Sequence, residues 1–459
     1  MEQVKVFGTL EGNLTSFQQN LHKNLNEDPV KEDITTPFLN QFDKSTYYYQ
    51  YSEKMKLSEN NDVFIYKAKH NAHCLLHSDL TQELPSIECM DGYTAKWDLN
   101  IGRNIIESGN ISLNDEVIQN IHYLTNHIHD QSMINDKDKK INDINIGNIS
   151  SLQNFSKILH SYDLSYSPPF FYNTDASKSA KLYYLSYNDR FEHKFILRRQ
   201  IEDLLIIHDS DGNKVDLNDE SIYKIGGVTL SDKNILLPLP QLWGHYGHLT
   251  EEECFYNKNN SENNNKDMFY IEDSQLIELP NPSSLGKNVD IQIKNSEFPI
   301  LRLAWFAQNQ TSLENNNYFN FTTNSENCFK GYSPIKSTTL NNGTINLWKD
   351  YPQFRVERVL PRRQFVSTPM VPGIGLLNLG VDCNNSVAQP ATIIKDGSFS
   401  AKLTDTNPNL QFDSSMRCKD NFRLYLVLTV LKCIKFDEYP KTEKERHKKN
   451  CTIEIIGNS

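Results

Sequence analysis

Short runs of apolar and aromatic residues alternate with polar clusters along most of the chain. From about Tyr47 onward, runs rich in Tyr, Phe, Ile, Leu and Val are separated by groups of Asn, Asp, Ser and Gly. Successive side chains of a strand point to opposite faces of a sheet, and the turns between strands collect these polar residues. The pattern therefore predicts an all-β sandwich or barrel. The strand candidates include Phe64–Leu76, Tyr93–Ile106, Lys181–Leu197, Ile222–Leu230 and Asp290–Ile293.

The clearest strand candidate runs from Arg423 to Phe436. Its apolar residues fall on both faces of the strand rather than on one face only. A strand of this kind is typical of the centre of a sheet that is covered on both sides. One face carries Leu424, Leu426, Leu428 and Val430, and the other carries Tyr425, Val427, Leu431 and Cys433.

Two segments interrupt the β pattern with helix signals. The first begins at Asn114, where Ser112 and Asp115 could frame the start of a helix. Its apolar residues recur at helical spacing. These residues are Val117, Ile121, Leu124 and Ile128. In the second, Thr250 precedes three glutamates and Glu253 can complete a capping box with it, which predicts a short helix that ends near Tyr256.

Length and pattern divide the chain into two domains with flanking segments. With 459 residues and a mass of 53.1 kDa, the chain exceeds one typical domain. Residues 1–46 have few sustained apolar periods, so we expect an arm outside the cores. We place the first domain at 47–207, the second at 208–436 and an exposed C-terminal tail at 437–459. The stretch 257–267, NKNNSENNNKD, has no apolar residue and predicts a solvated loop.

Charge and cysteine usage exclude some classes of partner. The formal net charge of −11 would repel phosphate backbones, so direct nucleic-acid binding is disfavoured. No apolar run reaches the length of a membrane span, and the N-terminal sequence MEQVKVFGTLEGN does not resemble a secretion signal. The eight cysteines are scattered without the close pairs of metal sites, and we expect mostly free thiols.

Histidine pairs are the first candidates for chemistry. His127 and His129 form a His-Ile-His motif, which could bind a metal if it lay on a strand. It falls in a predicted helix, where residues two apart face different directions, so we expect solvated helix histidines. His245 and His248, in LWGHYGHL, have no carboxylate or Cys partner at ligand spacing. We expect them in a loop or at a strand edge.

The segment from Asp209 to Glu220 is similar in spacing to a calcium-binding EF-hand loop. Asp209, Asp211, Asn213 and Glu220 occupy its oxygen-ligand positions. The position that requires Gly for the sharp bend is occupied by Lys214. A tight Asp-Gly turn between strands is therefore the favoured interpretation.

The sequence offers no recognisable catalytic constellation. It contains no nucleophile elbow, phosphate-binding glycine loop or paired-Cys zinc pattern, and Gly226-Gly227 lacks the third glycine and helix of a nucleotide site. We therefore expect no catalytic, cofactor-binding or metal-binding residues, and a protein that is not an enzyme.

Several ordered motifs resemble major capsid proteins of nucleocytoplasmic large DNA viruses. FPILRLAWFAQNQ, Phe298–Gln310, and the YFNF of Tyr318–Phe321 look like a signature of that family. LWGHYGHLTEEECFY, Leu242–Tyr256, and the following MFYIEDSQLIE are similar to its strand, acidic helix start and next strand. The segment Ser167–Leu197 resembles its Pro-aromatic strand, loop and long strand. A later segment carries the matching Pro372, Gly373, Ile374, Gln389, Pro390 and Ser400, whereas Ala391 and Asp396 depart from the common pattern.

The resemblance, which spans about residues 90 to 436, implies both a fold and a role. The fold is a double jelly roll, two tandem eight-stranded antiparallel sandwiches with short helices in loops. Three copies would form a pseudo-hexagonal capsomer of an icosahedral shell. The implied partners are further copies of the chain, minor capsid and penton proteins, and an inner viral membrane. The implied location is the virion, after assembly in the host cell, with the cytoplasm as the expected compartment.

Other roles on the same fold remain open at this point. A membrane-shaping viral scaffold has the same architecture. A carbohydrate-binding jelly roll would use aromatics such as Trp243 and Trp348, although both are more often core or interface residues. An enzyme would have only the His-Ile-His pair in its favour.

Two structural expectations concern the second domain. Trp305 shares the alternation of Leu301 and Leu303, so we expect it to be buried. The connection from Asn341 to Pro372 is expected to lie outside the sandwich, on the opposite side from the N-terminal arm. It carries a cationic cluster that suits contacts between subunits: Arg355, Arg358, Arg362 and Arg363.

Calcium should not contribute to folding, because the loop after Asp209 lacks the glycine of an ion site and has Leu217 where an oxygen ligand commonly sits. We expect a chelator such as EDTA to leave the melting temperature unchanged in a thermal scan. A fall in melting temperature on chelation that disappears in Asp211→Ala would contradict this expectation.

Overall fold

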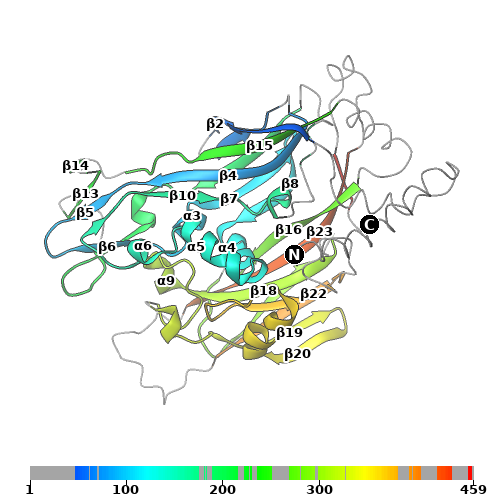
Figure 1. Cartoon of the computed structure of the whole chain (residues 1–459). Coiled ribbons are helices and arrows are strands. Elements are labelled where there is room, and N and C mark those ends of the chain that lie inside the picture. The colour runs from blue at the N-terminus through cyan, green and yellow to red at the C-terminus, as the bar shows by residue number, and fades with distance from the viewer. Residues whose placement is uncertain are drawn as a thin grey trace, which may run out of the picture.

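The computed structural model shows two antiparallel β-sandwiches that lie against each other (Figure 1). It describes residues 47–60, 63–69, 72–174, 180, 182, 189–215, 222–226, 228–229, 235–250, 268–279, 281–294, 298–325, 327–380, 392–394, 396–404, 421–436 and 453–456. The predicted arm, the predicted helix beyond Thr250 and the loop 257–267 lie outside these residues. The predicted double jelly roll is confirmed.

The first sandwich consists of two main sheets with every strand pair antiparallel. One sheet has the order β1 (Tyr47–Lys54), β15 (Gln241–Leu249), β4 (Cys74–Leu84) and β10 (Tyr162–Tyr166). The other has the order β2 (Lys56–Asn60), β3 (Val63–Lys67), β11 (Phe191–Leu197), β7 (Ile106–Leu113) and β8 (Glu116–His122). Two small sheets extend one end: β12 (Leu205–His208) with β6 (Thr94–Trp97), and β14 (Val228–Thr229), β13 (Tyr223–Ile225), β5 (Ile87–Cys89) and β9 (Ile158–Leu159).

The second sandwich repeats the plan. Its inner sheet has the order β16 (Met268–Glu278), β23 (Phe422–Phe436), β18 (Ile300–Asn309) and β21 (Gly375–Asn378). Its outer sheet has the order β17 (Asn288–Lys294), β22 (Asp396–Leu403), β19 (Ile335–Asn342) and β20 (Ile345–Pro352). A last strand, β24 (Ile453–Ile456), pairs with β23, so this part of the predicted C-terminal tail belongs to a sheet.

The strand β15 changes the expected division between the domains. It lies between β1 and β4, and its Leu242 and Tyr246 belong to the first hydrophobic core. The predicted boundary after residue 207 therefore cuts through the first sandwich, since the chain returns to complete that sheet. We propose a boundary between Leu249 and Met268.

Short helices occupy the connections between strands. In the first sandwich these are α3 (Ile101–Asn104), α4 (Tyr123–Met133), α5 (Asp136–Asn145), α6 (Ser150–Gln153), α7 (Phe171–Thr174) and the 3₁₀ turn η2 (Ile201–Asp203). In the second they are α9 (Gln310–Glu314), η3 (Cys328–Lys330), the π-helical turn η4 (Arg355–Val359) and α10 (Pro361–Gln364).

The helix predicted from Asn114 begins one strand later than expected. Asn114 and Asp115 have φ angles of 50° and 71°, and they form the turn between β7 and β8. Two consecutive residues with positive φ suit a tight hairpin, so the chain reverses instead of entering a helix. The helix α4 starts only at Tyr123, where the His122 ring accepts a hydrogen bond from the backbone N–H of Leu124.

A third hydrophobic cluster joins the two sandwiches. Leu124 and Ile128 of α4 pack with Phe306 of β18 and with Phe319 and Phe321 of the segment that follows α9. This cluster is separate from the two sandwich cores. The burial of α4 against the second sandwich therefore fixes the position of one sandwich on the other.

Buried polar contacts reinforce the same junction. The Asp273 carboxylate of β16 accepts a hydrogen bond from the backbone N–H of Asn120 in β8 at 2.7 Å. Its other oxygen lies 2.5 Å from Lys432 Nζ of β23. Gln119 of β8 donates to the backbone carbonyl of Glu272 at 2.9 Å. The hydrogen bonds from Asn120 to Asp273 and from Gln119 to Glu272 form only when the sandwiches are docked, whereas the Lys432 pair lies within the second sandwich.

Two glycines allow close packing where the predicted family motifs meet. Gly373 has a φ of 101°, and a side chain there would collide with the backbone of Phe321. A Cβ on Gly375 would collide with the ring of Trp305. Both sites therefore require the residue without a side chain.

The connection from Asn341 to Pro372 is more ordered than expected. Its first part completes a hairpin between β19 and β20, with Gly343 at a φ of 57° in the turn. The rest contains η4 and α10, whose residues Val356 and Pro361 are buried. The prediction that this segment lies outside the sandwich is therefore wrong for β20, because β20 pairs with β19, which in turn pairs with β22.

The predicted central strand and the predicted burial of Trp305 are both confirmed. The described side chains of β23 are buried on both faces except at a few positions, and Trp305 of β18 is fully buried. The indole N–H of Trp305 donates to Gln353 Oε1 at 2.9 Å. A register shift between Ile300 and Arg302 brings Ile300, rather than Leu301, into the core with Trp305.

Replacement of Trp305 with Ala should lower the free energy of unfolding by about 3–5 kcal/mol, because a large buried ring is lost and a cavity remains. Urea denaturation of the purified protein measures the change as a lower midpoint. Trp243→Ala, at a half-buried position on the face of β15, provides the control and should cost less. An unchanged midpoint for Trp305→Ala would contradict the burial.

Candidate functional site

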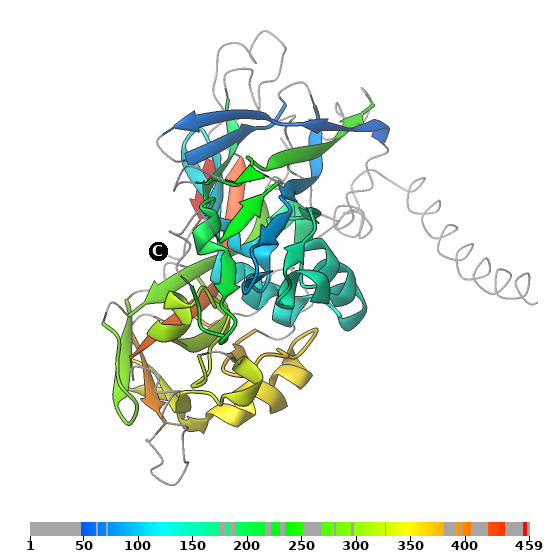
Figure 2. The same ribbon diagram turned by 90° about the vertical axis from the view of Figure 1, so that its left-hand side faces the viewer.

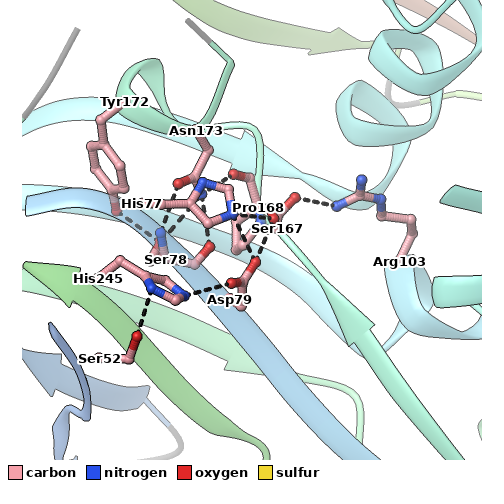
Figure 3. A network of polar contacts seen from close by, with 10 residues as sticks. All are labelled: Ser52, His77, Ser78, Asp79, Arg103, Ser167, Pro168, Tyr172, Asn173 and His245. Carbon is pink, nitrogen blue, oxygen red and sulfur yellow. Dashed lines mark hydrogen bonds and ion pairs between the residues drawn. The ribbon is translucent and has the colours of Figure 1, made fainter. Parts of the chain in front are cut away.

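A chain of polar contacts crosses the outer face of the first sheet (Figure 3). Ser52 of β1 lies 2.7 Å from Nδ1 of His245 on β15, and Nε2 of His245 lies 3.2 Å from Asp79 Oδ2 on β4. Ser167, just after β10, donates to Asp79 Oδ1 at 2.6 Å. The contacts thus connect β1, β15 and β4 with the residue that follows β10.

His77 joins the network at the same carboxylate oxygen. Its Nε2 lies 2.9 Å from Asp79 Oδ1 and 2.9 Å from Ser167 Oγ. Serine, histidine and aspartate are the residue types of a hydrolase triad, in which the carboxylate and the hydroxyl bind opposite nitrogens of the ring. Here both bind Nε2 of His77, so Ser167 lacks the geometry that would activate it. On His245 the Ser52 hydroxyl and the Asp79 carboxylate do bind opposite nitrogens, with the serine at Nδ1.

The network favours a charged Asp79. Partial burial would raise the pKa of its carboxyl, but hydrogen bonds from His77 and Ser167 and the nearby rings of His77 and His245 hold the pKa below its usual value. The carboxylate therefore accepts from three side chains that come from three different parts of the chain. Its effect is to hold β4, β15 and the end of β10 together.

A buried ion pair continues the network beneath the sheet. Arg103 of α3 binds both carboxylate oxygens of Asp130 on α4, at 2.8 and 3.0 Å, and donates to the backbone carbonyl of Ser167 at 3.0 Å. Burial would raise the pKa of Asp130, but the charge of Arg103 and the contact with His129 lower it to about 2. The pair is charged and tethers α4 to the first sandwich.

The His-Ile-His motif lies on a helix, as predicted, but its two histidines differ. His129 is partly exposed and lies 3.8 Å from Asp130. His127 is fully buried, with its ring stacked on Phe319 at a centroid distance of 4.3 Å. The prediction of a solvated His127 is therefore wrong, because this face of α4 packs on the second sandwich. Burial lowers the pKa of His127 to about 4.

His245 and His248 lie on β15, a central strand rather than a loop or a sheet edge. The expectation that they have no carboxylate partner fails for His245, since Asp79 comes from β4. The rings of His248 and His73 lie 4.8 Å apart between centroids. Sequence spacing alone could not reveal this grouping, because β4 and β15 are about 160 residues apart.

The loop after Asp209 is the tight turn that the sequence favours. The Asp209 carboxylate accepts hydrogen bonds from the backbone N–H groups of Asp211 and Asn213, and Gly212 has a φ of 82°. Those oxygens are thus used within the turn. Glu220 lies outside the described residues.

The two tryptophans that favoured carbohydrate binding are used within the fold. Trp348 stacks on Trp305 at 6.0 Å between ring centroids. The ring of Trp243 has Lys54 Nζ at 5.0 Å from its centroid, and its N–H donates to Thr81. Neither provides an open aromatic platform for a sugar, which removes the observation behind that alternative.

A cavity of about 1130 Å³ opens between α4, α5 and the strands of both sandwiches. Its lining is mixed, with Arg103, Asp130, Glu272 and Arg302 among the charged groups. Asn126 of α4 also lines it, fully buried and with neither amide atom hydrogen-bonded to protein. Arg103 is paired with Asp130 and Arg302 with Glu272, so these four groups belong to the junction of the sandwiches.

Metal and thiol chemistry find little support in the described part of the chain. No group of three His, Cys, Asp or Glu side chains there could hold a metal ion. Of the described cysteines, Cys89 and Cys328 are free thiols, as the sequence led us to expect, and Cys74 and Cys433 are buried. The other four predicted thiols lie outside the described residues: Cys254, Cys383, Cys418 and Cys451.

Comparison with known proteins identifies the first sandwich. Residues 46–224 match the family model described as the major capsid protein N-terminus. No curated protein sequence matches the chain.

Solved structures extend the comparison to both sandwiches. The Faustovirus major capsid protein matches with a TM-score of 0.66 and 7% identity, over 85% of this chain and 90% of that chain. The VP54 protein of PBCV-1, fitted into a reconstruction of the virophage Sputnik, matches with a TM-score of 0.62 and 10% identity, over 85% and 94%. A quasi-atomic model of the PBCV-1 capsid matches with a TM-score of 0.61 and 12% identity, over 85% of this chain and 95% of that chain.

At these identities the likeness to solved structures shows the fold, and the family-model match covers residues 46–224, less than half of the chain. Both agree with the motifs at Ser167–Leu197 and Phe298–Gln310. The chain is thus a double jelly-roll protein whose residues 46–224 are similar to the N-terminal part of major capsid proteins.

Proposed function

We propose that this protein builds the shell of an icosahedral DNA virus as a trimeric, pseudo-hexagonal capsomer. The observation that carries the proposal is the rigid pairing of two similar sandwiches in one chain. Three such chains around a threefold axis present six similar sandwiches. Six similar bodies tile a hexagonal lattice although the chain is present in only three copies.

The junction between the sandwiches supports this role, because a subunit of a regular lattice must keep a fixed shape. The hydrophobic cluster around Phe306 and the buried Asp273 carboxylate both join the sandwiches. A junction with a packed apolar centre and a buried carboxylate bonded across it resists hinge motion. The angle between the two sandwiches is then a fixed property of the subunit.

A structural role also agrees with the chemistry of the polar groups. Asp79, His77 and Ser167 brace a sheet and lack the geometry of a nucleophile with its base. Asp130 and Arg103 neutralise each other in the interior. We propose that the protein is not an enzyme and requires no cofactor, and that its function resides in its surfaces.

The partners we propose are further copies of the chain, minor capsid and penton proteins, and an inner viral membrane. Within the described residues no helix is long and apolar enough to cross a membrane. The net charge of −11 argues against direct contact with the packaged genome. We place the protein in the virion, with assembly in the cytoplasm of the host cell.

Self-association tests the proposal. The purified protein should show the mass of three chains in solution at micromolar concentration, by light scattering coupled to gel filtration. A strictly monomeric protein would contradict the capsomer. Labelling of the protein in infected cells separates the two roles within the family, since a shell protein stays on mature particles and a membrane-shaping scaffold leaves them.

The junction should also show in stability. Asp273→Asn removes the charge that compensates Lys432 but keeps the size of the side chain. An uncompensated buried charge should lower the free energy of unfolding by about 3–5 kcal/mol, measured by urea denaturation. Glu278→Gln on the same strand is the control, because its ion pair with Arg423 is largely exposed and should cost about 1 kcal/mol or less. Equal effects of the two changes would contradict a buried polar junction.

A further inference from the structure

Four exposed arginines lie close together beside β20. They form the arginine patch on η4 and α10: Arg355, Arg358, Arg362 and Arg363. In the described part of the chain no carboxylate makes an ion pair with any of them. Among the described residues, Arg355 alone of the four has an aromatic partner, with its guanidinium 5.2 Å from the ring centroid of Tyr351. In a chain of net charge −11, so many cations without an ion-pair partner in the described part indicate a binding partner.

The backbone beneath the patch is firmly held. Val356 is fully buried, and Phe365 is buried at the end of α10. Gln353 accepts a hydrogen bond from Trp305 and donates to Glu357 at 2.9 Å each. A surface that is already in place loses less conformational entropy on binding. The arginines are thus presented on a preorganised base.

Apolar side chains lie exposed among and beside the arginines. Phe354 is 62% exposed, Val359 40% and Met370 74%. Arginine, aromatic residues and methionine are enriched at protein interfaces, whereas lysine and acidic residues are depleted. A polyanion such as nucleic acid would use the charges but gain little from Phe354 and Met370. The composition favours a protein partner with an acidic surface.

An acidic counterpart lies on the first sandwich of the same chain. Glu83 of β4 and Asp163 of β10 are direct cross-strand partners, and both are exposed. Like charges at directly opposed positions destabilise a sheet. Among the described residues neither has a cation as ion-pair partner. This acidic pair would be relieved by a cation that another chain supplies.

The two surfaces lie on different sandwiches. In Figure 1 β4 and β10 lie above α4 and α5, and β20 lies below these helices. The turned view of Figure 2 likewise has the blue strands of the first sandwich at the top and the yellow turns of the second at the bottom. A contact between two different surfaces of identical chains is head-to-tail, and such contacts close into rings when the rotation permits.

We propose that the arginine patch of one subunit docks on the Glu83–Asp163 acidic pair of the next, and that this contact closes the trimer. The inference rests on the proposed capsomer and names the surfaces that hold it together. Guanidinium groups bind carboxylates through paired hydrogen bonds, which adds orientation to the charge attraction. The exposed Phe354 and Met370 then become buried at the contact.

Charge reversal tests the contact. Arg362→Glu with Arg363→Glu should raise the concentration at which half of the trimer dissociates roughly tenfold or more, measured by analytical ultracentrifugation. Glu83→Lys with Asp163→Lys should do the same. Lys137→Glu, which removes an exposed positive charge from α5, is the matched control and should leave the trimer unchanged.

A variant that carries both charge reversals gives the sharpest test. Its exchanged charges should attract each other again and restore the trimer. A monomeric wild-type protein would overturn the proposed capsomer itself. A trimeric wild type whose stability is unaffected by either reversal would overturn only this contact. Retention on heparin that disappears with the arginine reversals, while the trimer stays intact, would assign the patch to a polyanion and would also overturn the proposal.

Discussion

The structure depends on one packed junction, the burial of α4 between two β-sandwiches. Leu124 and Ile128 contribute one apolar face of α4 to the second sandwich, where they meet Phe306, Phe319 and Phe321. Asp130 on the same helix is held by Arg103 of the first sandwich. A helix anchored in this way on both sides cannot move without breaking an apolar cluster and a buried ion pair. The two sandwiches therefore behave as one body, as the proposed capsomer requires.

The polar groups of the first sandwich serve the same purpose. The carboxylate of Asp79 ties β4 to β15 through His245 and to the end of β10 through Ser167. The backbone carbonyl of Ser167 then accepts from Arg103. This sequence of contacts runs from an exposed sheet face to the buried junction (Figure 3). Residues that could suggest catalysis are thus part of the framework that holds the sheet and α4 in register.

The sequence pattern predicts the buried strands and the tight turn of this structure, because both depend on residues that are close together in the chain. The alternation around Trp305 and along β23 predicts buried strands, because each side chain's face follows from the period of two. Asp209 and Gly212 predict a tight turn because backbone geometry there selects those residues. The motifs around Phe298 and Ser167 allow the double jelly roll to be predicted, because they resemble motifs of a known family.

The features that could not be predicted from the sequence depend mostly on contacts between residues far apart in the chain. Asp79 and His245 meet because β4 and β15 pair, and nothing near either residue indicates that pairing. His127 has the surroundings of a surface histidine in sequence, yet it stacks on Phe319 from the second sandwich. The turn at Asn114 has helix-like apolar spacing after it, but two residues with positive φ turn the chain into a hairpin. The outward position of His77 and Asp79 two residues apart on one strand is the only local hint of the network.

Electron microscopy of the purified protein tests the central claim, that two rigidly joined sandwiches in each of three chains form one hexagonal tile. Averaged end-on views should show six lobes of similar size with threefold symmetry and a constant spacing between the two lobes of each chain. Isolated two-lobed particles, or lobes whose spacing varies from particle to particle, would contradict it.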